Sequence, residues 1–194
     1  MTTVNAIDID TLGKTIAAVE NDPELAQCRF RATNRWQGGN RNIGRVKSFY
    51  AAKQELEHRT TYETHSDEPP ILAGDDSAAN PVEHLLTALA ACITTSLVAH
   101  AAVRGIELDS VESHLEGEID LNGYLGLRDD VPRGYQRIQV RFEVESDADA
   151  EELQKLAEFS PVFNTIMNGA EVDLRVEKRR PTQQPETPME AGHP

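Results

Sequence analysis

Two cysteines, Cys28 and Cys92, carry the thiols of this sequence, and their surroundings differ. Cys28 opens a stretch in which polar and apolar residues alternate, whereas Cys92 lies in the middle of the long apolar run 85–103. The nucleophile in cysteine chemistry is the thiolate, and burial among apolar groups disfavours that ion. A reactive Cys92 therefore needs a cation from elsewhere in the fold. Without one, Cys92 is a small core residue, which is a common role for a free cysteine.

The apolar run is predicted to form one helix that begins at Asn80. Asn80 is a favourable N-cap, Pro81 suits the first helical position, and Glu83 can complete a capping box. Cys92 then lies about three turns into the helix, beyond the first turn in which the helix dipole acts. The helix explains why Cys92 is buried, but it does not supply the cation.

The same helix offers an apolar approach to the thiol. Leu85 and Leu89 lie seven and three residues before Cys92 and share its face of the helix. The run nearly has the length that spans a bilayer. It contains several threonines, a serine and a histidine, however, and no second apolar segment accompanies it. We therefore expect a helix buried by sheets or by a partner chain and predict no membrane association.

The elements that must position this helix follow from the periodicity of the rest of the chain. Alternation with a period of two predicts strands, and apolar spacing of three to four predicts helices. In the first strand, Cys28, Phe30 and Trp36 are expected on the buried face, and Val172, Leu174 and Val176 point inward in the last. The order of elements predicts an α+β fold. The expected segments are a helix at 7–20, strands at 28–36, 44–51, 58–65, 111–121 and 137–145, helices at 149–159 and 161–168, and a strand at 170–178.

Charge and composition narrow the possible functions. The 194 residues are 39% hydrophobic and 27% charged, as in an ordinary globular domain. A net charge of −14 argues against nucleic-acid binding. The arginine-rich stretch 29–45 can instead serve a small anion or a thiolate. The six histidines form no ligand-spaced pair, so we predict no metal and no cofactor. The first residues lack a secretory signal, which predicts a cytoplasmic, reducing location.

Three segments together resemble the OsmC/Ohr family, the osmotically induced and organic hydroperoxide resistance proteins. They are "NPVEHLLTALAACITTSL" around Cys92, the early hairpin "WQGGNRNIGRV" and the closing unit "SPVFNTIMNGAEVDLRV". The resemblance covers residues 28–178. We expect residues 1–27 to be an N-terminal helical extension and residues 179–194 to be a disordered, proline-rich tail.

The resemblance implies an intertwined homodimer with active sites at the subunit interface. Antiparallel sheets wrap around buried central helices in that family. Its active members are thiol-dependent peroxidases, in which a central-helix cysteine attacks the peroxide and a second cysteine resolves the sulfenic acid. An arginine from the early hairpin, assisted by a glutamate, holds the first cysteine as a thiolate.

Carried onto this sequence, the resemblance assigns the attacking thiol to Cys92. Arg41 is the first candidate for the arginine and Arg45 the second. Glu83 matches the glutamate, although a role in capping alone is an open alternative. The position of the second cysteine is occupied by Ser160, which can cap a helix but cannot form a disulfide. Cys28 is far away in sequence and has no motif that supports a resolving role.

Two functions from different classes remain. The first is a one-cysteine peroxidase that reduces organic hydroperoxides through Cys92 and is regenerated by an external thiol. The second is a non-catalytic dimer that binds a small apolar ligand. A cysteine hydrolase is not supported, because His84 and His100 both lie about 80° away from the Cys92 face of the helix. His65 either lines the thiol site or is a solvated loop residue.

Overall fold

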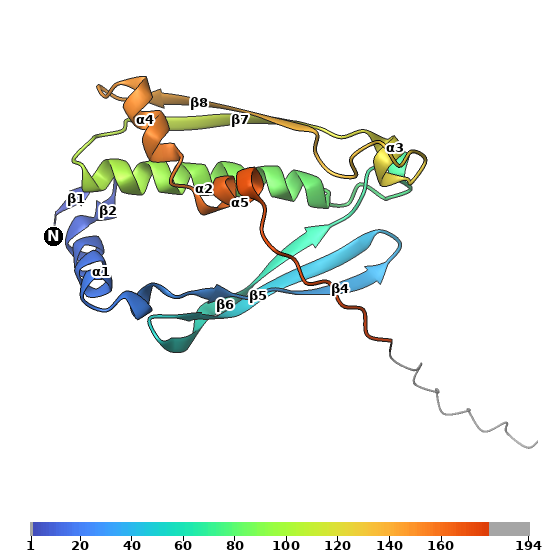
Figure 1. Ribbon diagram of the computed structural model, residues 1–194, viewed down its shortest axis with the longest axis horizontal. Coiled ribbons are helices and arrows are strands. Elements are labelled where there is room, and N and C mark those ends of the chain that lie inside the picture. The colour runs from blue at the N-terminus through green and yellow to red at the C-terminus, as the bar shows by residue number, and fades with distance from the viewer. Residues whose placement is uncertain (1, 179–194) are drawn as a thin grey trace, which may run out of the picture.

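The computed structural model describes residues 2–178, and its organising element is the helix α2 (Pro81–Val103). Figure 1 shows α2 between two antiparallel sheets: the two-stranded ribbon of β7 and β8 above it, and the sheet that contains β4, β5 and β6 below it. The short helices α4 and α5 lie alongside α2. The predicted α+β fold with antiparallel sheets and a central helix is confirmed.

Local sequence signals set both ends of α2. Asn80 accepts a hydrogen bond from the backbone N–H of Glu83, and the Glu83 carboxylate accepts one from the N–H of Asn80, which completes the predicted capping box. At the other end, Gly105 adopts a φ of 71°, which a residue with a side chain would resist. The N–H groups of Gly105 and Ile106 then bond to the carbonyls of Ala102 and Ala101, as in a Schellman motif.

One stripe of α2 is buried within the chain. Leu89, Ile93, Leu97 and Ala101 recur every four residues and are at most 5% exposed. Leu97 and Ala101 pack with Leu153 and Leu156 of α4 (Ala150–Ala157), and residues from the β7–β8 ribbon close around them. The remaining faces of α2 are only partly covered: Leu85 is 40% exposed. By length and composition α2 could cross a membrane, but its apolar stripe forms the core of this fold.

The ribbon pairs β7 (Ser110–Glu118) with β8 (Arg137–Glu145) along nine residues each. Alternate residues face α2, beginning with the pair Val111 and Val144. The connection between the strands contains a short helix, α3 (Leu121–Tyr124). Helix α5 (Pro161–Asn168) follows α4 and also packs on α2.

The lower sheet centres on β5 (Arg41–Ala51). On one side β5 pairs with β4 (Thr33–Gly38) and the two-residue strand β3 (Arg29–Phe30), and on the other with β6 (Gln54–Ser66). Gly38 and Gly39 make the β4–β5 turn with positive φ angles, as their sequence predicts. Short 3₁₀ turns at Pro23–Ala26 and Pro70–Leu72 complete the chain's connections to this sheet.

The N-terminal segment contains the short strands β1 (Thr3–Val4) and β2 (Ile7–Asp8) and the helix α1 (Ile9–Asn21). Asn5 donates to the carbonyl of Ile106 and accepts from the N–H of Leu108, which fixes the segment to the end of α2. The helix predicted at 7–20 is thus present. The division of the chain at residue 27 stays a prediction, and the predicted disordered tail lies outside the described residues.

Two expectations about the strands are wrong for the single chain. Residues 170–178 form no strand in the structure, and Val172, Leu174 and Val176 are 82%, 83% and 89% exposed. A strand needs a partner edge for its backbone hydrogen bonds, and none of the described strands pairs with this segment.

The buried face predicted for the first strand is wrong for the same kind of reason. The strand is divided into β3 and β4, Cys28 is exposed, and Phe30 and Trp36 are 76% and 72% exposed. An alternating pattern predicts which residues share a face, but it does not say which chain covers that face.

Candidate thiol site

Cys92 is a free, half-buried thiol in the middle of α2. It lies beside the buried stripe, since Leu89 and Ile93 flank it at 2% and 5% exposure. Leu85, one turn further toward the helix start, remains 40% exposed. Of the two leucines expected to line the approach, the structure therefore leaves Leu85 accessible and places Leu89 in the protein interior. Cys28 is also free and is exposed at the start of the lower sheet, so no disulfide links the two cysteines.

Arg41 begins β5 and lines a cavity of about 310 Å³ at the end of the lower sheet. Polar side chains dominate this cavity, with Asn42, His65 and Ser77 among them. The nearest acid to Arg41 is Asp75, whose carboxylate oxygen is 3.9 Å from the guanidinium, and both side chains are more than half exposed. A guanidinium held this loosely is free to bind another anion.

Arg45, the second candidate, has a different environment. Its Nε lies 2.7 Å from the Glu63 carboxylate on the neighbouring strand β6, so its charge is already paired. Arg45 also does not line the cavity that contains Arg41. Between the two candidates, the geometry favours Arg41 as the arginine that is available to a thiolate.

The loop between β6 and α2 shapes the wall of the Arg41 cavity, and Asp67 organises this loop. Asp67 is 1% exposed and accepts hydrogen bonds from the hydroxyl and N–H of Ser77 and from the N–H groups of Glu68 and Asp75. These bonds, led by the Ser77 hydroxyl, lower the pKa of Asp67 to about 2. Gly74 is required nearby, because a Cβ there would overlap the Glu68 backbone.

The first turn of α2 adjoins the cavity and is anchored on both sides. The ring Nε2 of His84 lies 2.9 Å from the carbonyl oxygen of His65, one of the cavity residues. On the other side, the Tyr135 hydroxyl donates to the carbonyl of Val82 at 2.9 Å. Burial and the nearby Glu83 carboxylate raise the pKa of Tyr135. Sequence reasoning missed Tyr135, because a tyrosine in the β7–β8 connection carries no local signal of a contact with α2.

Glu83 is fully engaged as the capping residue of α2, yet its charge adjoins the loop that borders the Arg41 cavity. The Glu83 carboxylate contributes, after burial and Asp67, to raising the pKa of Glu68. Relative to Cys92, however, Glu83 is badly placed. Nine residues separate them, which corresponds to about 13.5 Å along the helix and to the opposite side of it. Glu83 cannot contact the Cys92 thiol of the same chain.

His100, which the sequence places away from the Cys92 face, and His65, whose role the sequence leaves open, have different surroundings. His100 stacks on Phe159 with ring centroids 4.1 Å apart, and burial followed by the Arg104 charge lowers its pKa. His65 lies on strand β6 rather than in a loop, with its side chain 61% exposed at the rim of the Arg41 cavity.

Ser160 is completely buried at the start of α5. Its hydroxyl accepts a hydrogen bond from the N–H of Phe163 at 3.2 Å, so it caps the helix as expected. Next to α5 lies a second cavity of about 520 Å³ between α2, β8 and α4. Apolar side chains form most of its lining, including Ile93, Leu97, Phe142 and Phe163.

Comparison with known proteins assigns the family. A family model described as OsmC-like protein matches residues 74–175, which is more than half of the chain. The chain belongs to the OsmC-like family. No curated protein matches the sequence.

Solved structures of OsmC-like and related proteins align with this chain at low sequence identity. The OsmC-like protein of Mycoplasma pneumoniae aligns with a TM-score of 0.54 at 17% identity, over 73% of this chain and 89% of that one. An OsmC-like protein of unknown function from Vibrio cholerae aligns with a TM-score of 0.52 at 11% identity, over 71% and 92%. The organic hydroperoxide resistance protein of Bacillus subtilis has a TM-score of 0.42 at 21% identity, over 72% and 91%.

The match to the OsmC-like family model includes some of the expected site residues and omits others. Glu83, Cys92 and Ser160 lie within residues 74–175, whereas Cys28 and Arg41 precede them. The family assignment therefore covers α2 and its thiol. The family match does not include Arg41, so its assignment to the site is supported only by the geometry of the cavity and by the resemblance of the early hairpin.

Proposed function

We propose that this OsmC-like protein is a thiol-dependent peroxidase that reduces organic hydroperoxides through Cys92. The observation that carries the proposal is the half-buried free thiol of Cys92 in the middle of the central helix of an OsmC-like domain. Leu85 offers an apolar surface near the thiol for the organic part of a hydroperoxide. The protein acts in the cytoplasm, where thiols are kept reduced.

The reaction uses one thiol of the protein, Cys92, and two equivalents of an external thiol. The Cys92 thiolate attacks the outer oxygen of the hydroperoxide, the O–O bond breaks, and the alkoxide takes up a proton and leaves as the alcohol. Cys92 is then a sulfenic acid. One external thiol condenses with it, releasing water and forming a mixed disulfide, and a second attacks that disulfide to release Cys92. The external thiol is required because Ser160 has no sulfur to offer.

Arg41 supplies the cation that the thiolate needs. Its guanidinium pairs only loosely with Asp75 and lines a polar cavity near the start of α2. Cys92 lies about three turns further along the helix from that start. In this proposal, Arg41 and Glu83 therefore meet the Cys92 thiol of a second copy of the chain, and two copies form a homodimer with shared sites.

Exposed apolar side chains support a homodimer. The apolar side chains of Phe30, Trp36 and Leu174 are among those left in solvent. Burying such residues in an interface is the usual way in which a chain avoids large exposed apolar patches. The segment 170–178 would also gain a strand partner from a second copy.

Peroxide consumption by the purified protein tests the activity. Wild-type protein, Cys92→Ser and the matched control Cys28→Ser are given an organic hydroperoxide with dithiothreitol as reductant. Wild type and Cys28→Ser should consume the peroxide at the same rate, and Cys92→Ser should not exceed the rate without protein. Equal slow consumption by all three proteins would refute the proposal.

Complementation between inactive chains tests the shared site. Arg41→Ala and Cys92→Ser are co-expressed with different affinity tags, and the mixed dimer is isolated. A shared site predicts that the mixed dimer recovers about half of the wild-type activity, because one of its two sites is intact. If Arg41 and Cys92 acted together within one chain, the mixed dimer would be as inactive as the Arg41→Ala or the Cys92→Ser protein.

The apolar cavity favours a second candidate function, a non-catalytic dimer that binds a small apolar ligand. Its volume of about 520 Å³ lies in the range of small-molecule sites, and its lining is mostly apolar. Mass spectrometry of organic extracts from the purified protein distinguishes the two functions. A stoichiometric apolar molecule in protein without peroxide turnover would favour the binding function, and turnover that depends on Cys92 would favour the peroxidase.

A further inference from the structure

We propose that the outer face of the β7–β8 ribbon binds one divalent transition-metal ion through Glu112, His114 and Glu143. One ligand atom from each of the three side chains lies within 4.8 Å of the others. The His114 Nε2 is already 3.5 Å from a Glu112 carboxylate oxygen. This site is on the side of the ribbon that faces away from α2 and is independent of the chemistry proposed for Cys92.

The strand register creates this cluster. Glu112 and His114 are two residues apart on β7, so their side chains point to the same face. Glu143 lies directly opposite Glu112 on β8. Two carboxylates that face each other across a strand pair repel, and the Arg141 guanidinium beside Glu143 offsets only part of that repulsion, because the pair is exposed. A bound ion would satisfy both.

The donor set indicates which ions fit. Two carboxylate oxygens and one imidazole nitrogen suit Zn²⁺ and related first-row ions, whereas Mg²⁺ and Ca²⁺ prefer oxygen alone. All three side chains are exposed. They can therefore close to the bond lengths of about 2.0–2.2 Å that Zn²⁺ requires, with water in the remaining position.

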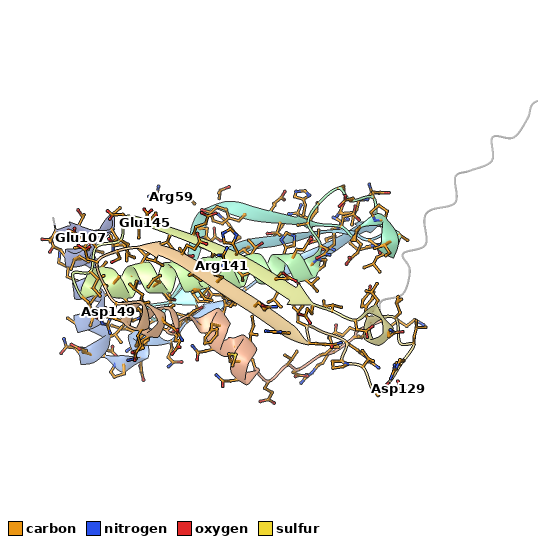
Figure 2. The ribbon with its side chains drawn as sticks, turned by 90° about the horizontal axis from the view of Figure 1, so that it is seen from above. Arg59, Glu107, Asp129, Arg141, Glu145 and Asp149 are labelled. Atoms are coloured by element: carbon orange, nitrogen blue, oxygen red, sulfur yellow. The ribbon has the colours of Figure 1, made fainter. Side chains whose placement is uncertain are left out.

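Arg141 competes with the ion for Glu143. Its guanidinium is 2.8 Å from a Glu143 carboxylate oxygen, and it lies opposite His114 in the register. Figure 2 shows Arg141 and Glu145 on the upper surface of the ribbon, above α2. Both partners of the Arg141–Glu143 pair are more than half exposed, so the pair is weak and easily exchanged. Removing Arg141 should therefore strengthen metal binding.

The spacing of the histidines along the sequence gives no sign of this cluster. The third ligand here comes from the neighbouring strand, 29 residues after His114. Only the register brings it to the other two.

Calorimetric titration with ZnCl₂ at pH 7.5 tests the proposal. The full chain is used with Cys28→Ser and Cys92→Ser, because thiolates also bind zinc. We expect one ion per chain. Since even the loss of an indirect partner weakens metal sites by about 10- to 100-fold, His114→Ala and Glu143→Gln should lower the affinity at least that much. Circular dichroism verifies that each variant is folded.

Two further variants complete the titration. Glu116→Gln removes a carboxylate from the same face, outside the cluster, and should leave the affinity unchanged. Arg141→Gln should raise it. The proposal is overturned if the cysteine-free chain takes up no zinc, or if its affinity is the same with and without His114.

Discussion

The capping box of α2 allows the two roles of Glu83 to be separated. Asn80 and Glu83 exchange hydrogen bonds of 2.8 Å at the helix start. Asn80→Ala removes the cap but keeps the Glu83 charge, and should cost about 1 kcal/mol. In a chain of this length that free energy corresponds to a fall in Tm of about 2–4 °C. Glu83→Gln keeps an acceptor for the Asn80 N–H and removes the charge, which costs about 0.3–1 kcal/mol at a helix N-terminus.

The two variants should differ in activity although their stabilities are similar. If the Glu83 carboxylate orients Arg41 in a shared site, Glu83→Gln removes a charged hydrogen bond worth about 1.5–3 kcal/mol. Because each 1.36 kcal/mol is a factor of ten in rate, kcat/KM should fall by about 10- to 100-fold. Asn80→Ala keeps the carboxylate and should leave kcat/KM close to the wild-type value.

The assay pairs thermal unfolding by circular dichroism with peroxide consumption at one fixed protein concentration, since the Tm of a dimer depends on concentration. The matched variants have similar stability and differ in the charge at position 83. A normal kcat/KM for Glu83→Gln would show that Glu83 is a cap only, and would refute its assignment to the thiol site.

Three further changes test the packing and the loop. Leu97→Ala empties a core position that is 1% exposed and should lower the free energy of unfolding by about 2–5 kcal/mol, measured by urea denaturation. Ser160→Ala loses the bond from the Phe163 N–H and should cost about 1 kcal/mol with unchanged peroxide turnover; a loss of turnover at normal stability would contradict a purely capping role. The pKa of Asp67 is lowered in the fold to about 2, so its stabilisation is present above its unfolded pKa of about 4 and is lost as the pH falls toward 2. Unfolding of Asp67→Asn should accordingly depend less on pH in that window, and an unaltered dependence would contradict the lowered pKa of Asp67.

Local signals were enough to predict those parts of the fold that depend on residues close together in the sequence. The start of α2 was predicted from Asn80 and Glu83, because a cap is made by residues three apart. The two strands of the β7–β8 ribbon were predicted, at 111–121 and 137–145, from alternation that includes Val111 and Val144.

Other features depend on contacts between distant parts of the molecule, and the sequence could not supply them. Phe30 and Trp36 alternate correctly but are exposed, since no described element of the chain covers them. Tyr135 reaches Val82 across 53 residues, and nothing local marks that contact. The choice between Arg41 and Arg45 required the structure, which pairs Arg45 with Glu63 and leaves Arg41 in a cavity.

The central claim is that Cys92 is the peroxidatic thiol, and the most direct test is its oxidation state after exposure to hydroperoxide. The protein is treated with one equivalent of an organic hydroperoxide, trapped with dimedone, digested and analysed by mass spectrometry. The account predicts a sulfenic-acid adduct on the peptide that contains Cys92, and none on the Cys28 peptide. An unmodified Cys92 in folded protein, or equal labelling of both cysteines, would contradict it.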